Sequence, residues 1–426
     1  MFSFQAKTVP ERNYWLNLAE GVIFISSAAF LSPQVILPAL ITRMGGGNVV
    51  IGALPVLIYV GLFLPQIFAA RHVETIAWKQ GWALRFGFIQ RLNVLLMALA
   101  IAILAGNHPL IALSLFLAFY ALMHIFAGIA TPGWFDFYIK ITPANRRGRL
   151  AGLRTSLGAL SAFFFGFLFT AILALVAYPL NYAIGLFLAF MLQMGSLGTQ
   201  RMMIETEPSK TLPKRPLTAY LWELPEVLRT NAPFREFLRS SAVLIVANMP
   251  IGFFTVYALK RFDAQETMVG EFVISLLLTQ VIGAFFSGIV ADRHGNKLPL
   301  IIAACGTLAA SLWALLAPSV GWFRIVFLLL GFNLGTEMMA RYNISVEYGP
   351  AEKRSTYVAL MNTALAPVYL SALAGGWIAN TFGYPVLFAT GILFSIAGLY
   401  MLLYTVQDPR ELRAAEREKG VAQPAT

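Results

Sequence analysis

The chain is poor in charged residues and almost without cysteine, and both shortages narrow what it can be. Only 12% of its 426 residues are charged, whereas 58% are hydrophobic. A soluble domain carries about 25% charged residues. The single cysteine, Cys305, lies in an apolar stretch and cannot form an intramolecular disulfide. These values exclude a soluble globular domain and a disulfide-stapled scaffold.

Motifs for metal, nucleotide and hydrolytic chemistry are also missing from the sequence. The four histidines lie far apart, with no His-Glu-x-x-His pair. No Gly-Lys dipeptide occurs, so there is no P-loop for ATP. No Gly-x-Ser-x-Gly elbow or Asp/His cluster suggests a membrane enzyme. We therefore expect no enzyme, no metal and no cofactor.

What the chain does have is a series of long apolar stretches. A bilayer core of about 30 Å requires about 20 apolar residues in a helix. The run from Ser161 to Leu175 does not alternate polar and apolar residues, which favours helices over a barrel. The sequence predicts an all-α polytopic membrane protein with twelve transmembrane helices in two pseudo-symmetric six-helix bundles. We expect helices near 15–42, 49–70, 85–106, 109–140, 150–177, 180–203, 237–261, 267–291, 298–317, 321–347, 355–381 and 384–406.

Basic residues set the orientation, because cytoplasmic loops are enriched in Lys and Arg. The net charge of +11 therefore reflects helix ends, and we expect no nucleic-acid partner. With both termini in the cytoplasm, only four basic residues fall on the outer side, namely Arg43, Lys260, Arg261 and Arg324. Compact loops favour a bacterial inner membrane.

One long break in hydrophobicity divides the chain. It begins with a Pro-rich polar linker and continues through Tyr220 to Arg229, whose mixed pattern is typical of a helix lying on the inner surface. The predicted domains are a first bundle at 1–203, a cytoplasmic linker with an interfacial helix at 204–236, a second bundle at 237–406 and a solvated cytoplasmic tail at 407–426.

The two halves share a weak internal echo. The segment 143–153 aligns with 350–360, and each joins the fourth helix of its half to the fifth. Likewise 67–72 aligns with 289–294, after the second helix of each half. Matches at equivalent positions indicate duplication.

The segment Gly288-Ile-Val-Ala-Asp-Arg-His-Gly-Asn-Lys297 resembles the G-x-x-x-D-R-x-G-R/K-K/R signature of the major facilitator superfamily of secondary transporters. The six-plus-six layout and the long middle loop fit the same family. The resemblance implies alternating access, with a central cavity lined by the first, fourth, seventh and tenth helices. The loop between the second and third helices departs from the signature, because Ala70 stands where the acid would be and Arg71 and Glu74 are partial substitutes.

The signature also has a physical interpretation. Gly288 and Gly295 permit close helix approach and a tight turn, and Asp292 can accept hydrogen bonds from the amides at the start of the eleventh helix. Arg293 and Lys297 can reach Glu347, and such pairs would close the inner mouth in one state; ordinary positive-inside charge plus a turn is the alternative. Asp136 is expected to pair with Arg71, Arg147 or Arg149. The predicted gating set is Gly288, Asp292, Arg293, Gly295, Lys297, Asp136, Arg147, Glu347 and Arg354.

Polar residues inside apolar helices are the candidates for contact with a solute, because ionisable groups in a bilayer face a cavity or a partner. In the tenth helix, Asn333, Glu337 and Arg341 share one face, and Glu337 could carry a coupling proton. A self-neutralised ion pair is the alternative. The other candidates are Glu20, His124, which can titrate near neutral pH, and Asn248, which precedes a break at Pro250; each could equally be structural.

The sequence thus predicts a monomeric secondary transporter, in contact with lipid, that moves a small organic solute and is driven by protons or by the solute gradient. A non-transporting sensor or scaffold on a carrier fold is the alternative. Whether the solute is an exported drug or metabolite or an imported nutrient such as a sugar is left open.

Overall fold

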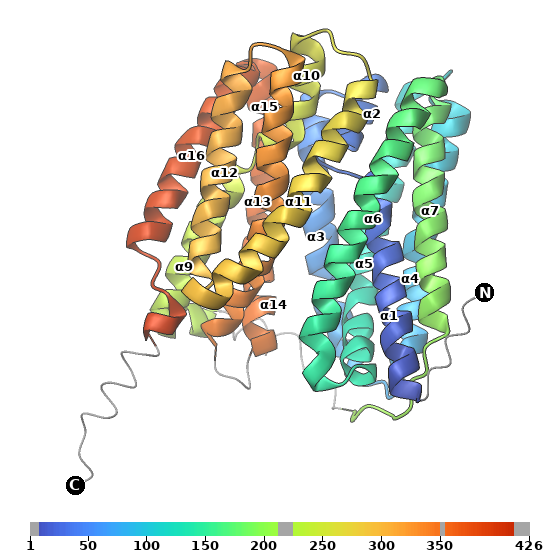
Figure 1. Cartoon of the computed structure of the whole chain (residues 1–426), viewed down its shortest axis with the longest axis vertical. Helices are drawn as coiled ribbons and strands as arrows, with labels where there is room; N and C mark the ends of the chain where they lie inside the picture. Colours follow the sequence, from blue (N-terminus) through green and yellow to red (C-terminus); the bar gives the residue numbers. More distant parts are fainter. Residues whose placement is uncertain (1–7, 212–224, 350–353, 413–426) are drawn as a thin grey trace. The chain divides into compact units, whose positions relative to one another are not determined.

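The computed structural model describes residues 8–211, 225–349 and 354–412, and the regular elements of these ranges are helices (Figure 1). Eleven of the described helices, counting those continued across a short break, are long and apolar enough to cross a membrane. The first half contains α1 (Val9–Ser26), η1 (Ser27–Phe30), α2 (Ile36–Arg43), α3 (Asn48–Val73), α4 (Gln80–Leu104), α5 (Pro109–Ile141), η2 (Ala144–Arg146), α6 (Arg147–Leu175) and α7 (Leu180–Arg201). The second half contains α9 (Ala232–Ala247), η3 (Ile251–Phe253), α10 (Phe254–Arg261), α11 (Thr267–His294), α12 (Lys297–Leu316), α13 (Val320–Glu347), α14 (Arg354–Leu365), η5 (Ala366–Leu370), α15 (Ser371–Thr381) and α16 (Tyr384–Tyr404).

Three of the predicted helices, the first, the seventh and the eleventh, are interrupted rather than continuous, and the eleventh consists of α14, η5 and α15 in succession. The first is α1, η1 and α2 in succession, and the side chains of Ser26 and Ser27 bond back to Val22 O and Phe24 O at 2.7 Å where α1 ends. Such back-bonding bends helices. The seventh helix breaks after Ala247, as the Asn248–Pro250 pattern predicts. The all-α transmembrane fold is confirmed. The predicted interfacial helix lies partly outside the described residues.

By packing, the chain forms two compact units, which we call unit 1 and unit 2. Unit 1 comprises Met1–Leu217 together with Gly252–Leu278, and unit 2 comprises Thr218–Ile251 together with Thr279–Thr426. Unit 1 therefore includes α10 and the start of α11. The predicted division at 204–236 stays a prediction.

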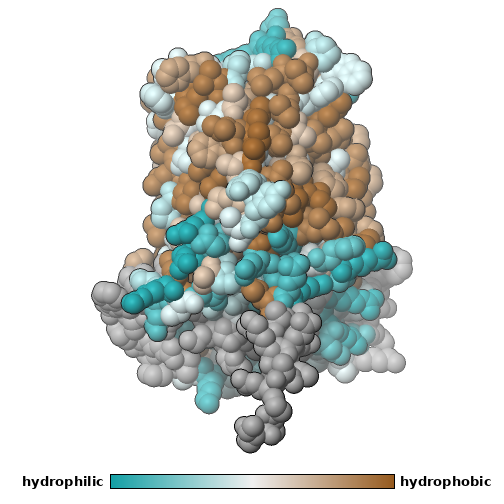
Figure 2. Space-filling model, turned by 90° about the vertical axis from the view of Figure 1, so that its left-hand side faces the viewer, coloured by the Kyte–Doolittle hydropathy of each residue, from teal (hydrophilic) through white to brown (hydrophobic). Residues whose placement is uncertain are grey.

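Apolar side chains are widely exposed on the helix surfaces, as lipid contact requires. Phe285 in α11, Leu393 and Tyr404 in α16 and Phe164 in α6 all expose more than 60% of their surface. Figure 2 shows one face on which hydrophobic residues cover the middle and hydrophilic residues gather towards the two ends. The protein is an integral membrane protein.

Glycines let particular helix pairs approach closely. A Cβ on Gly128 of α5 would stand 2.3 Å from Leu62 O of α3, and one on Gly335 of α13 would stand 2.1 Å from Gln280 O of α11. Small residues at such crossings are typical of membrane helices. Gly288 was predicted to permit an approach of this kind. That prediction is wrong for the described part of the chain, because a Cβ at Gly288 would meet none of its atoms within 4 Å.

Candidate functional site

A buried ion pair lies inside unit 1 between α1 and α6. Oε2 of Glu20 is 2.6 Å from Nη2 of Arg154, and only 4% and 10% of the two side chains are exposed. Ser196 of α7 donates its hydroxyl to Oε1 of Glu20 at 3.0 Å. Arg154 also donates to the backbone and side-chain oxygens of Asn17. Glu20 is thus held by groups of its own unit.

A second guanidinium, that of Arg91 in α4, completes this cluster. Its Nε donates to Gln193 O at 2.7 Å and its Nη1 to Gly87 O at 2.8 Å. Its Nη2 lies 3.4 Å from the Ser196 hydroxyl, which joins it to Glu20. The cluster therefore holds two cations and one anion. Carbonyl oxygens and aromatic rings compensate the extra charge, since the Arg154 guanidinium lies 5.3 Å from the Trp134 ring centre.

In unit 2, the polar stripe of the tenth helix divides into two parts. Glu337 and Arg341 of α13 form an ion pair one helical turn apart, with 14% and 13% of their side chains exposed. Asn333 instead packs against α12, where its amide donates to Ala303 O at 2.6 Å and to the Thr307 hydroxyl at 2.8 Å. Asn333 is 1% exposed, so it lies in a helix interface.

The other two predicted transport residues also lie against neighbouring helices. Asn248, at the end of α9, accepts the Thr307 hydroxyl at 3.1 Å, so it belongs to the same polar group as Asn333. His124 in α5 packs edge-on against Tyr120, with its Cβ near Gly61 of α3. Its Nε2 is buried and has no hydrogen-bond partner among the described residues.

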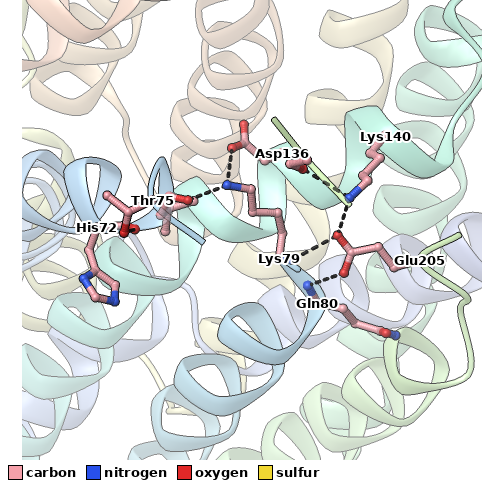
Figure 3. A network of polar contacts seen from close by, with 9 residues as sticks. His72, Thr75, Lys79, Gln80, Asp136, Lys140 and Glu205 are labelled. Carbon is pink, nitrogen blue, oxygen red and sulfur yellow. Dashed lines mark hydrogen bonds and ion pairs between the residues drawn. The ribbon is translucent and has the colours of Figure 1, made fainter. Parts of the chain in front are cut away.

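The C-terminal ends of α3, α5 and α7 meet the start of α4 in a polar network that the sequence did not predict (Figure 3). Glu205, which follows α7, accepts the backbone amides of Lys79 and Gln80 at 2.9 Å and the Lys140 ammonium at 2.8 Å. The Lys79 ammonium donates to Val73 O. Burial lowers the pKa of Lys79, although the nearby carboxylate of Asp136 opposes this.

Asp136 pairs differently from the expectation. Its carboxylate lies 3.8 Å from the Lys79 ammonium, because Lys79 caps the start of α4 beside the inner end of α5. Arg147, one of the expected partners, bonds instead to Ile139 O at 2.7 Å and Thr142 O at 3.1 Å. It therefore satisfies carbonyls at the end of α5, as a basic residue at a helix C-terminus does.

The signature loop of unit 2 is held by the segment after α16. Gly295 has a φ of +84°, the conformation that the predicted tight turn requires. A Cβ there would stand 2.8 Å from Oδ2 of Asp408. Arg410 donates to Ala291 O at 2.7 Å and to Asp292 O at 3.2 Å. The prediction of a solvated tail is therefore wrong at its start, where Asp408 is 6% exposed.

Glu347 has a partner outside the predicted pairs. Asn296 donates its amide to Glu347 at 2.8 Å. Lys297 donates to Leu403 O at 3.4 Å, since α12 packs against α16. Asp292 and Arg293 are exposed at the end of α11. The side chain of Arg354 and residues 350–353 lie outside the described part of the chain, so the predicted contact at the eleventh helix lies there too.

The missed residues had a sequence signal in one case only. Arg91 and Arg154 lie inside predicted apolar helices, and an arginine at such a position is a signal of burial. Near a helix end the same residues also fit the basic residues expected on the cytoplasmic side, which masks this signal. Glu205 lies in the polar linker, which also contains Glu207. No local pattern distinguishes it from Glu207.

Comparisons with known proteins agree with this architecture. Residues 240–426 match the family model described as Major Facilitator Superfamily. Among curated proteins, the chain is 25% identical over 193 residues to a niacin transporter of Acinetobacter baylyi, covering 38% of this chain and 43% of the relative. It is also 25% identical over 204 residues to a gallate transporter of Pseudomonas putida, covering 48% and 43%. The chain thus spans less than half the length of these relatives.

Solved structures match over nearly the whole chain. The nucleoside transporter NupG superposes with a TM-score of 0.68 at 9% identity, covering 94% of this chain and 100% of that one. A D-xylose-proton symporter superposes with a TM-score of 0.66 at 13% identity, covering 94% and 99%. At these identities the likeness shows the fold. The family match over residues 240–426, the signature segment and the shared fold make the chain similar to transporters of the major facilitator superfamily.

Proposed function

We propose that this protein is a secondary transporter that carries a small organic solute across the membrane by alternating access, with a proton as the coupling ion. One observation carries the proposal. Each unit buries a carboxylate–guanidinium pair in its membrane-spanning helices, Glu20–Arg154 in unit 1 and Glu337–Arg341 in unit 2. Ionisable groups at this depth are costly, and in membrane proteins they mark solute and proton pathways.

The two pairs favour transport over the sensor or scaffold alternative. A buried pair is weak evidence for stability, because the cost of desolvation can exceed the Coulombic gain. A scaffold would lose little if apolar side chains replaced Glu337 and Arg341. A carrier can use the pair, because protonation of the carboxylate releases the guanidinium and changes the energy balance between two conformations.

Of the two acids, Glu337 is the proposed site of proton binding. It lies on α13, the tenth helix of the predicted twelve, and its partner is one turn away on the same helix. Glu20 is tied to three other helices through Arg154, Ser196 and Arg91. We therefore assign Glu20 a positioning role within unit 1 and Asn333 a packing role between α12 and α13. Asn248 and His124 are kept as candidates for solute contact.

The relatives suggest which solutes to try first. The niacin and gallate transporters are named for aromatic carboxylic acids, and the solved neighbours for a nucleoside and a sugar. We propose an aromatic carboxylate as the first solute to test, because two of the relatives are named for such acids. We further propose a monomer in a bacterial inner membrane with both termini in the cytoplasm and a domain division at 204–236.

The experiment begins with binding and then measures transport. A thermal-shift panel of nicotinate, gallate, D-xylose and uridine on the purified protein identifies a ligand. Counterflow of that ligand in proteoliposomes then tests transport. A solute that raises the melting temperature but shows no counterflow would favour the sensor alternative.

Glu337→Gln tests the coupling site, because it removes the titrating group and keeps the shape of the side chain. We expect gradient-driven uptake to be lost and counterflow to become independent of pH. Glu207→Gln, an exposed acid in the linker, is the matched control. If Glu337→Gln transports normally with unchanged pH dependence, the proton role assigned to Glu337 is wrong.

A further inference from the structure

In both units, the segment that follows the sixth helix of the half contacts the loop between the second and third helices. In unit 1 that segment begins after α7 and reaches the loop between α3 and α4. In unit 2 it begins after α16 and reaches the signature loop between α11 and α12. The two sets of contacts involve different side chains and occur independently in each unit.

The contacts in unit 1, which we call the linker clasp, are formed by Lys79, Lys140, Glu205 and Ser209. The Glu205 side chain is 4% exposed and uses both oxygens, one on the Lys79 amide and the Lys140 ammonium, the other on the Gln80 amide. Figure 3 shows Glu205 between Lys140 and the start of α4. A carboxylate at this end of a helix also interacts favourably with the helix dipole.

The linker clasp extends beyond Glu205 to Ser209. The Lys140 ammonium lies 3.1 Å from the Ser209 hydroxyl, and the Ser209 amide donates to Ala77 O at 2.8 Å. The segment 205–209 is thus bonded both to the loop before α4 and to the inner end of α5.

The contacts in unit 2, which we call the tail clasp, are formed by Gly295, Asp408 and Arg410. The buried Asp408 carboxylate accepts the Arg410 amide at 2.9 Å and lies against Gly295, where there is no room for a side chain. The Arg410 guanidinium binds two carbonyls at the end of α11. The Tyr348 hydroxyl adds a bond to Gln407 O at 2.6 Å.

The two clasps follow one plan. Each places an acid from the segment after the sixth helix on the inner loop, Glu205 in one and Asp408 in the other. In each, a cation also binds a carbonyl at the end of the second helix: Lys79, from the loop itself, on Val73 O, and Arg410, from the segment after α16, on Ala291 O. The same arrangement built from different residues indicates a role that both halves require.

We propose that the clasps are positioning devices that hold the two inner loops in fixed geometry and so set the rate of conformational exchange, without contacting the solute. The proposal rests on the transport function proposed above. A loop that adopts the same conformation in every transport cycle loses conformational entropy when it becomes ordered. The charge-assisted hydrogen bonds of the clasps offset this unfavourable free energy. Their loss should slow turnover and leave solute affinity unchanged.

Glu205→Gln tests the linker clasp, with Glu207→Gln as the matched control. We expect the maximal counterflow rate of Glu205→Gln to fall about tenfold, the factor that corresponds to one hydrogen bond to a charged group, while its half-saturation concentration and ligand-induced thermal shift match wild type. Glu207→Gln should behave as wild type. A rate for Glu205→Gln equal to that of the control would overturn the role of the linker clasp.

Truncation and substitution test the tail clasp in the same way. A chain ending at Leu412 retains every described contact of the tail clasp, whereas a chain ending at Gln407 has lost Asp408 and Arg410. We expect only the shorter chain to turn over slowly with unchanged affinity. Arg410→Gln should reproduce the defect and Arg410→Lys should restore part of the rate, because an ammonium can still bind a carbonyl. Equal rates for the two truncations would overturn this half of the proposal.

A measurement that does not depend on transport separates the clasp from the proposed function. In a Cys305→Ser background, which removes the single native cysteine, Ser209→Cys can be labelled with a maleimide. Adding Glu205→Gln should speed labelling several-fold by freeing the segment, whereas adding Glu207→Gln should not. If the wild-type protein shows no counterflow but Glu205→Gln still speeds labelling of Ser209→Cys, the proposed transport function is wrong and the linker clasp is supported. If wild type transports and Glu205→Gln changes neither rate nor labelling, the clasp fails alone.

Discussion

Glu20 and Arg154 lie 2.6 Å apart inside unit 1, on helices that are distant in the sequence. Removing one partner of a buried pair leaves an uncompensated charge, which costs about 3–5 kcal/mol. We therefore expect Glu20→Gln to lower the melting temperature in detergent markedly. Glu20→Gln combined with Arg154→Met should recover part of the loss, because the two effects are coupled. Additive losses in the double variant would show that the pair does not act as a unit.

A substitution at Asn333 distinguishes a role in helix packing from a role in binding the solute. Its amide bonds to Ala303 O and to the Thr307 hydroxyl in the interface between α12 and α13. We expect Asn333→Ala to lower stability by about 0.6–1.7 kcal/mol, the range for hydrogen bonds between membrane helices, with little change in ligand affinity. Thermal unfolding and a binding titration measure the two. Lost affinity at unchanged stability would return Asn333 to the solute site.

Gly270 brings α11 against α6 within unit 1. A Cβ there would stand 2.2 Å from the Thr170 hydroxyl and 2.8 Å from its Cα. Because backbone cannot move aside cheaply, we expect Gly270→Val to cost about 1–3 kcal/mol of stability by overpacking. Gly198→Val, at a helical glycine with no atom within 4 Å, is the control. Equal melting temperatures for the two would contradict the close approach.

The burial of Lys79 should make the stability of the protein depend on pH. Burial lowers the pKa of its ammonium from 10.5, with Asp136 opposing the shift. The charged form is thus costlier in the folded protein, so the penalty is complete below the folded-state pKa and vanishes as the pH rises to 10.5. Lys79 should therefore make the melting temperature rise with pH in that window. This rise should be absent in Lys79→Met and retained in Lys210→Met, a variant at an exposed position.

The helices could be read from the sequence because lipid imposes a strong and local requirement. The apolar run between Gly, Pro and basic residues predicts the bounds of α12 to within one residue at each end. Asn248 and Pro250 predict the break after α9. The signature glycine Gly295 was recognised from the tight turn.

The side-chain partners could not be read, because they depend on which helices pack together. Glu20 has several basic residues in reach of the inner side, and only the packing of α1 against α6 selects Arg154. Asp136 likewise bonds to Lys79, which caps α4, rather than to a nearer arginine in the sequence. The choice between Glu205 and Glu207 follows from the path of the backbone after α7.

The segment Gly252–Leu278 packs in unit 1 although it follows the central linker in the chain. A ribosome that has just completed the linker has therefore not yet supplied all of unit 1, because α10 and the start of α11 are still to be made and inserted. Of two co-expressed fragments cut within the linker, the second would carry the part of unit 1 that the first lacks, so the first fragment should not mature before the two meet.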